Sequence, residues 1–231
     1  MHEHDEPRAV AERYARRPDD LRYHPLAPDV LCARQERQRV LVQLLRRHVG
    51  VPLDTLDVLE VGCGHGDQLI ELLALGFHPA RLVGNELLPA RAEAARGRLP
   101  AATALHEGDA MALAFGAERF DVVLLSTVFS SLLDDGYQQR LADQVWHWLR
   151  PGGAVLWYDF CWDNPRNPDV RGVPVARVRQ LFPAGRLHTR RVTLAPPLGR
   201  PAARLHPWCW TLLNTLPLLR SHRLIWITRP R

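Results

Sequence analysis

Three glycines at every second position follow a short apolar run in the segment Val58–Gly66, which reads VLEVGCGHG. Gly62, Gly64 and Gly66 allow the backbone to turn sharply and to approach a ligand within van der Waals contact, where a Cβ atom would collide. A helix expected to begin near Gly66 adds free backbone N–H groups that a ligand can use. A strand–helix turn that merely needs glycine is the alternative, but three glycines in register favour a ligand-binding loop.

The spacing of these glycines separates two classes of ligand. Dinucleotide-binding loops use G-x-G-x-x-G, in which the third glycine serves a pyrophosphate. Here the third glycine comes one residue earlier, and Glu60 precedes the first one. A carboxylate at Glu60 repels a pyrophosphate but suits the ammonium group of a methionine. The pattern therefore favours S-adenosylmethionine over a nicotinamide dinucleotide, and a nicotinamide-dependent dehydrogenase stays as an alternative.

Two more carboxylates follow the next two predicted strands. Glu86 ends the run LVGNE, where a carboxylate can accept hydrogen bonds from both hydroxyls of a ribose, or can simply be solvated at a strand end. Asp109 lies in the run EGDAM, where it can accept from an adenine amino group while the N–H of Ala110 reaches a ring nitrogen. Met111 is placed to pack on the adenine face or in the protein core.

Strands and helices are expected to alternate along the chain and to hold these loops. The predicted strands are Asp57–Val61, Arg81–Glu86, Thr103–His106, Phe120–Ser126, Ala154–Tyr158, Arg186–Leu194 and Arg223–Thr228. The predicted helices are Glu6–Arg17, Val30–Val49, Gln68–Leu75, Pro89–Leu99, Asp135–Leu149 (stopped by Pro151-Gly152-Gly153) and Val173–Phe182. This alternation predicts βαβ units and a mostly parallel sheet with helices on both faces.

The three loops, with FDVVLLSTVF (Phe120–Phe129) and LRPGGAVLWYDF (Leu149–Phe160), resemble the successive motifs of class I S-adenosylmethionine-dependent methyltransferases. The resemblance spans Leu53 to about Phe160. It implies an α/β fold, a Rossmann-like three-layer sandwich whose mostly parallel seven-stranded sheet has an antiparallel last strand. The residues expected to contact S-adenosylmethionine are Glu60, Gly62, Cys63, Gly64, Gly66, Glu86, Leu87, Asp109, Ala110, Met111, Ser126 and Thr127.

Two regions lie outside the motif-bearing segment. We predict that residues 1–52 form an N-terminal helical lid or substrate region, and that residues 53–231 form the methyltransferase domain. An insertion at about residues 195–219 is rich in proline and tryptophan and is predicted to contain a helix.

The acceptor is expected beyond the carboxyl ends of the strands, where open α/β sheets bind ligands. Asp159 is the candidate for a base or an orienting group, or it caps the turn into Asn164-Pro165. Aromatic residues of the N-terminal region can close over the cofactor or pack against the sheet edge, and the Arg166 side chain can bind the acceptor or be solvated. The predicted acceptor-binding residues are Tyr14, Tyr23, His24, Ser130, Tyr158 and Arg166.

The amino-acid composition indicates which kinds of binding partner are not expected. All thirty basic residues are arginines, dispersed except for Arg186, Arg190, Arg191 and the C-terminal tail, so the net charge of +5 does not indicate a nucleic-acid partner. Four scattered cysteines and the histidine spacing predict no metal site. No apolar run is long enough to cross a membrane and no signal peptide is visible, so we expect a cytoplasmic protein with no membrane partner.

The predicted reaction is transfer of a methyl group to an O or N atom of a small molecule, a secondary metabolite or a saccharide precursor, by a monomer or homodimer. Aligning the nucleophile for in-line displacement can supply roughly 7–11 kcal/mol of the barrier. The Asp/Asn-Pro-Pro-Tyr/Phe signature of many nucleic-acid and glutamine methyltransferases is missing after the fourth strand. An RNA or protein methyltransferase and a catalytically silent adenosylmethionine-binding partner protein are the alternatives.

Overall fold

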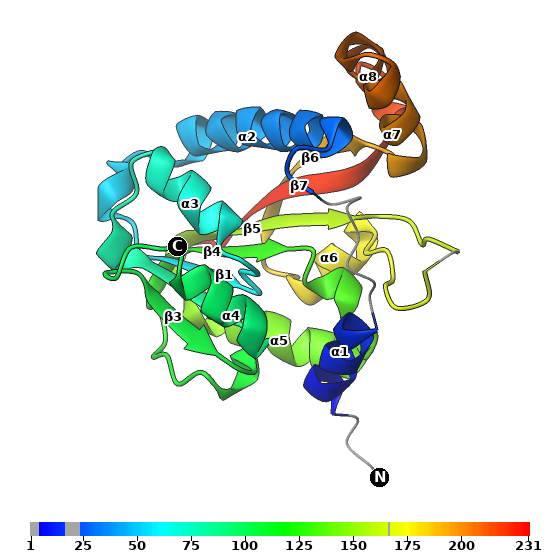
Figure 1. Cartoon of the computed structure of the whole chain (residues 1–231). Helices are drawn as coiled ribbons and strands as arrows, with labels where there is room; N and C mark the ends of the chain where they lie inside the picture. Colours follow the sequence, from blue (N-terminus) through cyan, green and yellow to red (C-terminus); the bar gives the residue numbers. More distant parts are fainter. Residues whose placement is uncertain (1–4, 17–23, 166) are drawn as a thin grey trace.

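Seven strands form one sheet in the computed structural model, which describes residues 5–16, 24–165 and 167–231 (Figure 1). The strands are β1 Val58–Val61, β2 Leu82–Glu86, β3 Ala104–Glu107, β4 Phe120–Ser126, β5 Leu149–Phe160, β6 Arg186–Leu194 and β7 Arg220–Thr228. The helices are α1 Glu6–Ala15, α2 Pro28–His48, α3 Asp67–Ala74, α4 Pro89–Arg96, α5 Asp135–Trp148, α6 Val175–Leu181, α7 Pro196–Leu205 and α8 Pro207–Asn214.

The strand order is β3-β2-β1-β4-β5-β7-β6. Strands β1 to β5 pair in parallel, whereas β7 runs antiparallel to both β5 and β6. This confirms the predicted mostly parallel sheet with an antiparallel last strand. The order reverses between β1 and β4, and such a reversal opens a crevice at the carboxyl ends of the strands, which positions a ligand site there.

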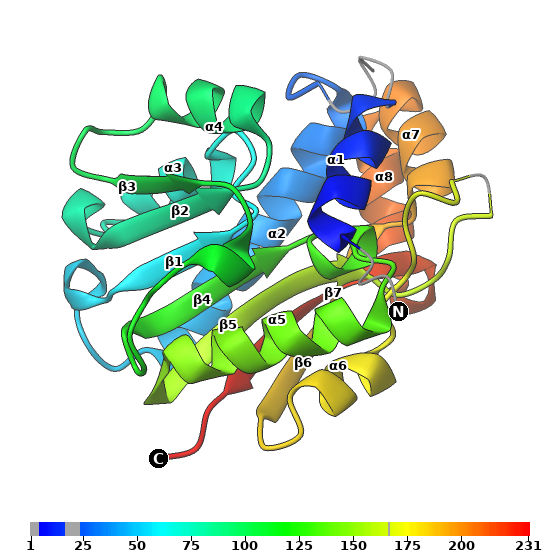
Figure 2. The ribbon, with the colours of Figure 1, turned by 90° about the horizontal axis from the view of Figure 1, so that it is seen from below.

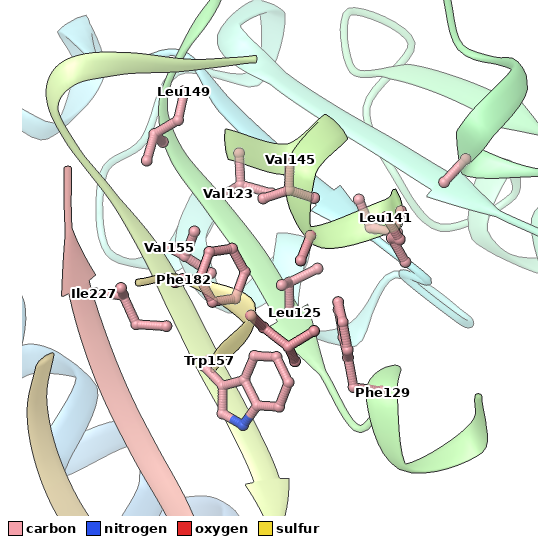
Figure 3. Packing of buried hydrophobic residues seen from close by; sticks show 14 of the residues in the cluster. Val123, Leu125, Phe129, Leu141, Val145, Leu149, Val155, Trp157, Phe182 and Ile227 are labelled. Atoms are coloured by element: carbon pink, nitrogen blue, oxygen red, sulfur yellow. The ribbon is translucent and has the colours of Figure 1, made fainter. Parts of the chain in front are cut away.

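Helices cover both faces of the sheet, and each face has its own apolar core (Figures 1 and 2). On one face, α2 and α3 pack on the sheet through residues such as Leu44 and Leu69. On the other face, α1, α5 and α6 cover side chains such as Val123, Leu125 and Trp157, as Figure 3 shows for part of this cluster. The uninterrupted apolar run in β4 is needed because its alternate side chains face opposite cores.

The N-terminal helix α2 belongs to the same core as the sheet. Its Leu41, Leu44 and Leu45 are buried in one cluster with Val58 and Leu224 of the sheet. The predicted lid region therefore contributes to the core on both faces of the sheet, since Val10 of α1 belongs to the cluster on the other face. Tyr23 of that region lies outside the described residues, as does Arg166.

The Pro-Gly-Gly segment after α5 differs from its prediction. It was expected to end the helix ahead of a strand that begins at Ala154, but β5 already begins at Leu149 and includes the segment. Gly152 adopts a φ of +82°, and a Cβ on Gly153 would lie 2.7 Å from the carbonyl oxygen of Asp121. The two glycines allow the strand to bulge there without losing its pairing with β4.

The insertion after β6 contains two helices where one was predicted. A proline disfavours the helical conformation in the residue before it, and His206, which precedes Pro207, has an extended backbone with a φ of −168°. This residue therefore separates α7, which ends at Leu205, from α8, which begins at Pro207. The pair has a small cluster of its own, in which Ala203 and Trp210 pack near Cys32 and Ala33 of α2. Figure 1 shows the pair standing beyond α2 at the β6 side of the sheet.

Candidate active site

A cavity of about 690 Å³ opens at the carboxyl ends of the parallel strands. Its walls come from α1, α2, the loops after β1 to β4, and the C-terminal elements β5, β6, β7, α7 and α8. This volume lies within the range of ~300–1,000 Å³ that is usual for sites that bind small molecules. A cavity of this size can bind small-molecule ligands.

The glycine loop after β1 forms part of the cavity wall. Gly62, Gly64 and Gly66 have φ values of +68°, +58° and +79°, a region that side chains rarely adopt. A Cβ on Gly62 would lie 2.9 Å from the Val128 side chain, whereas a Cβ on Gly64 would project into open space. Gly62 and Gly64 line the cavity, as predicted residues of a cradle should. Gly66 does not; it precedes α3 and packs against Leu99.

Glu60 presents an unpaired carboxylate oxygen at the cavity. The residue is 1% exposed, and its Oε2 has no hydrogen-bond partner among the residues that the structure describes. Burial raises the pKa of Glu60 well above its usual range, an effect that the nearby cation of Arg37 opposes. A buried carboxylate without a partner is costly, so a positively charged hydrogen-bond donor such as an ammonium group fits this position.

Glu86 is oriented by the backbone around it. Its Oε2 accepts from the N–H of Gly64 at 2.8 Å, and its Oε1 accepts from the N–H of Leu88 at 2.9 Å. Each oxygen keeps a second lone pair, and the residue lines the cavity together with Leu87. The arrangement fits the diol of a ribose, which needs two acceptors held in a fixed orientation.

Asp109 is held by a partner that the sequence did not reveal. Its Oδ1 accepts from the N–H of Met111 at 2.9 Å and also from the hydroxyl of Tyr137 in α5. Burial and the Asp109 carboxylate raise the pKa of Tyr137, which keeps that hydroxyl protonated as a donor. Asp109 and Ala110 line the cavity, whereas Met111 packs against the core.

Asn85 ties the second and third loops together. Its side-chain amide donates to the carbonyl oxygens of His106, at 3.3 Å, and Gly108, at 3.0 Å. The N–H of Gly108 in turn donates to the carbonyl oxygen of Glu86 at 2.9 Å. The N–H of Cys63, which also lines the cavity, donates to the carbonyl oxygen of Asn85 at 2.8 Å. The loops after β1, β2 and β3 therefore form one hydrogen-bonded unit.

The last residue of β4 and the residue after it are the remaining ones predicted to contact the cofactor. Ser126 and Thr127 line the cavity, and Thr127 has a φ of +53°. Its N–H donates to the carbonyl oxygen of Tyr158 at 2.7 Å, which holds this strained residue against β5.

Asp159 and Ser130 lie away from the cavity wall. Asp159 is 1% exposed, and its two oxygens accept from the N–H groups of Ser130, at 3.0 Å, and Phe160, at 2.9 Å. Burial raises the pKa of Asp159 to about 7. Neither Asp159 nor Ser130 is among the cavity-lining residues, and the carboxyl group connects β5 to the loop after β4. The predicted role of Asp159 as a base thus gains no support from its position.

Of the other predicted acceptor-binding residues that the structure describes, some line the cavity and one does not. Tyr14 and Tyr158 line the cavity, and the guanidinium of Arg91 lies 4.4 Å from the centre of the Tyr14 ring. His24 is exposed, and its Nδ1 accepts from the N–H of Leu26 at 3.2 Å.

Three polar side chains from the last strands gather at one part of the cavity wall. The hydroxyls of Tyr158 and Thr193 are 2.9 Å apart, and the His222 ring stacks on the Tyr158 ring with centroids 5.0 Å apart. Burial, with a smaller effect of Arg37, lowers the pKa of His222 to about 4, so its imidazole is neutral at pH 7. Sequence analysis missed Thr193 and His222 because they belong to strands without a recognisable motif.

Two arginines of α2, Arg34 and Arg37, bring positive charge to the wall. The Arg37 guanidinium lies 5.2 Å from the centre of the Tyr158 ring and 3.6 Å from the Glu71 carboxylate. These cations suit a carboxylate of a ligand whose ammonium group lies at Glu60. Within the described residues, no group of three or more His, Cys, Asp or Glu side chains could hold a metal ion.

Part of the chain is similar to a known family of protein domains. Residues 58–153 match the family model described as a methyltransferase domain. No curated protein matches the chain.

Solved structures share the fold over nearly the whole chain. A possible histamine N-methyltransferase from Thermotoga maritima is 16% identical, covers 96% of this chain and 97% of its own, with a TM-score of 0.61. A putative methyltransferase from Haloferax volcanii, solved with the Trm112 methyltransferase activator, is 17% identical, covers 89% and 96%, and has a TM-score of 0.61. Geranyl diphosphate C-methyltransferase from Streptomyces coelicolor, solved with S-adenosyl-L-homocysteine, is 15% identical, covers 84% and 77%, and has a TM-score of 0.59. At such identities these likenesses establish the fold.

Proposed function

We propose that this chain, whose residues 58–153 match a methyltransferase domain, is a class I S-adenosylmethionine-dependent methyltransferase and methylates an O or N atom of a small molecule held between Tyr158, Thr193 and His222. The observation that carries this proposal is the continuity of the cavity. The carboxylates that fit the cofactor and the polar side chains of the last strands line the same cavity. A cavity of about 690 Å³ has the size usual for small-molecule sites, which favours a small acceptor over an RNA or protein surface.

Three carboxylates would hold the cofactor. Glu60 would receive the methionine ammonium, Glu86 the ribose hydroxyls and Asp109 the adenine amino group. The cofactor supplies an electrophilic methyl group on a sulfonium. The residues of this chain then only need to align an acceptor for in-line displacement and to exclude water. The unpaired oxygen of Glu60 also speaks against a silent binding protein whose site has decayed.

The acceptor end offers a proton acceptor in the correct state. As the new bond to the methyl group forms and the bond from sulfur to the methyl breaks, an acceptor hydroxyl or ammonium must lose a proton. The imidazole of His222 is unprotonated near pH 7 and can accept a hydrogen bond that orients the acceptor, but with a pKa of about 4 it takes the proton only as a weak base. Leu194 and Trp210 provide the apolar part of the same wall. This composition favours an acceptor with a hydroxyl or amine on an apolar or aromatic frame.

The test uses the release of S-adenosylhomocysteine across a panel of phenols, catechols, amines and hydroxylated saccharides. With an active acceptor, we expect His222→Gln to lower kcat by about 10²- to 10⁴-fold and to leave the affinity for S-adenosylmethionine unchanged. His78→Gln is the matched control, because His78 is exposed and outside the cavity wall.

The pH profile gives a second readout for His222. Because its pKa lies at about 4, the rate should show no decline near pH 6.5 and should fall only as the pH approaches 4. Wild-type turnover in the His222→Gln variant would remove His222 from the mechanism. Absence of S-adenosylmethionine binding by the wild-type chain would remove the proposed function itself.

A further inference from the structure

The helices α7 and α8 and the turn after them expose large apolar side chains to solvent. Leu205 is 79% exposed and Trp208 is 75% exposed. We call the group the α7–α8 face; it consists of Leu198, Leu205, Trp208, Leu212, Leu216 and Leu218. Single exposed leucines are ordinary on a protein surface, but six large apolar side chains within one short segment indicate a surface that binds something.

Charge identifies the kind of partner. Between Val170 and Arg231 the chain has twelve arginines and no aspartate or glutamate, whereas all 25 acidic residues precede this segment. Arg204 and Arg191 are exposed in the same part of the chain. Five of the twelve arginines form ion pairs with acids of earlier segments: Arg171, Arg177, Arg200, Arg220 and Arg229. The positive charge offered to a partner therefore comes from the other arginines, Arg204 and Arg191 among them. An apolar face within a segment that carries only positive charge complements an apolar surface with negative charge.

We propose that the α7–α8 face binds the surface of an anionic lipid membrane. Trp208 and the exposed leucines would enter the boundary between headgroups and acyl chains, where tryptophan is favoured. The arginines would be attracted to the negative headgroups around them.

This proposal changes the partner expected from the sequence. That expectation rested on the absence of a membrane-spanning segment, and no helix of the described residues is long and apolar enough to span a bilayer. Binding to one surface of a membrane needs no spanning helix. The same two helices line the cavity with Gly199, Arg200 and Trp210, so a membrane-bound face would bring this part of the cavity wall close to the lipid.

Co-sedimentation with vesicles tests the proposal. The full chain is mixed with vesicles of phosphatidylcholine alone or of phosphatidylcholine and phosphatidylglycerol in equal parts. We expect binding to the mixed vesicles to exceed binding to phosphatidylcholine, and to weaken as salt screens the charges. Combined Leu205→Ser, Trp208→Ser and Leu212→Ser substitutions should weaken binding to the mixed vesicles by at least about tenfold, because these side chains would no longer be buried in lipid.

Controls separate the face from general stickiness. Trp162→Ser is the matched control, since Trp162 is 53% exposed on the loop after β5, outside the α7–α8 face, and its loss should leave binding unchanged. Arg204→Glu should weaken binding only to the mixed vesicles. Light scattering gives the oligomeric state of each variant, and thermal unfolding confirms that each is folded.

Three results would overturn the proposal. The wild-type chain could fail to bind the mixed vesicles, or the triple variant could bind them as well as wild type does. The third is a dimer that the triple variant dissociates, with no vesicle binding by either form, which would make the face a contact between two copies of the chain.

Discussion

Glu60→Gln should weaken cofactor binding without weakening the fold. The substitution keeps the shape of the side chain but removes the negative charge that would face the methionine ammonium. A charge-assisted hydrogen bond is worth about 1.5–3 kcal/mol, so we expect the Kd for S-adenosylmethionine to rise by about 10- to 150-fold. S-adenosylhomocysteine has the same ammonium group and should lose the same factor.

Although Glu60→Gln should weaken cofactor binding, it should raise the free energy of unfolding or leave it unchanged. The Glu60 carboxylate is buried with an unpaired oxygen, and its pKa is raised by burial. A folded-state pKa above the unfolded value gives stability that is present below the unfolded pKa and is lost as the pH rises through the folded pKa. The glutamine variant lacks this loss, so at pH 8 its free energy of unfolding should equal or exceed that of wild type.

Calorimetry and denaturant unfolding measure the two effects. Because an ammonium favours ionised Glu60, wild-type binding should release protons and tighten as the pH rises, and the variant should lose this linkage. Glu93→Gln is the control, since the Glu93 side chain is 78% exposed on α4. Wild-type affinity in Glu60→Gln, or an unfolding free energy clearly below wild type, would refute the assignment of Glu60 to the ammonium.

Three other substitutions probe the parts of the site separately. Tyr137→Phe removes the hydroxyl that donates to Asp109 and should raise the Kd for S-adenosylmethionine about 2- to 13-fold by calorimetry; an unchanged Kd would mean that the Met111 N–H positions Asp109 alone. Gly62→Ala should cost about 1–2 kcal/mol in chemical denaturation, because φ is +68° and the added Cβ meets Val128, whereas Gly50→Ala has free space and should be neutral. Asp159→Asn should keep kcat and remove the loss of stability that wild type shows as the pH rises from about 4 to about 7; a loss of kcat above about 100-fold would restore Asp159 as the base.

The position of the loop glycines and the carboxylates on one cavity wall could be predicted from sequence because their signals are local. Gly62, Gly64 and Asp109 follow a strand within a few residues and Glu86 is the last residue of one, and a strand followed by a turn places such residues at one edge of the sheet. Their order along the chain was therefore enough to bring them together.

The acceptor end could not be predicted in the same way. Successive side chains of a strand point to opposite faces, so only one of Tyr158 and Asp159 can face the cavity, and the sequence did not show which. His222 reaches Tyr158 only because β7 pairs with β5 antiparallel, opposite Phe160. Tyr137 reaches Asp109 from a helix that begins 26 residues later. Such contacts depend on the assembled sheet rather than on any local pattern.

The separate small core of α7 and α8 has a consequence for how this chain can change over time. Ala203 and Trp210 pack with a few residues of α2, apart from the two clusters that hold the sheet together. Mutations that remodel the two helices can therefore accumulate without disturbing the glycine loop or the carboxylates. The α7–α8 part of the cavity wall can thus vary separately from the strands that carry the carboxylates, Tyr158, Thr193 and His222, and a transplanted α7–α8 segment from a relative would change this part of the wall.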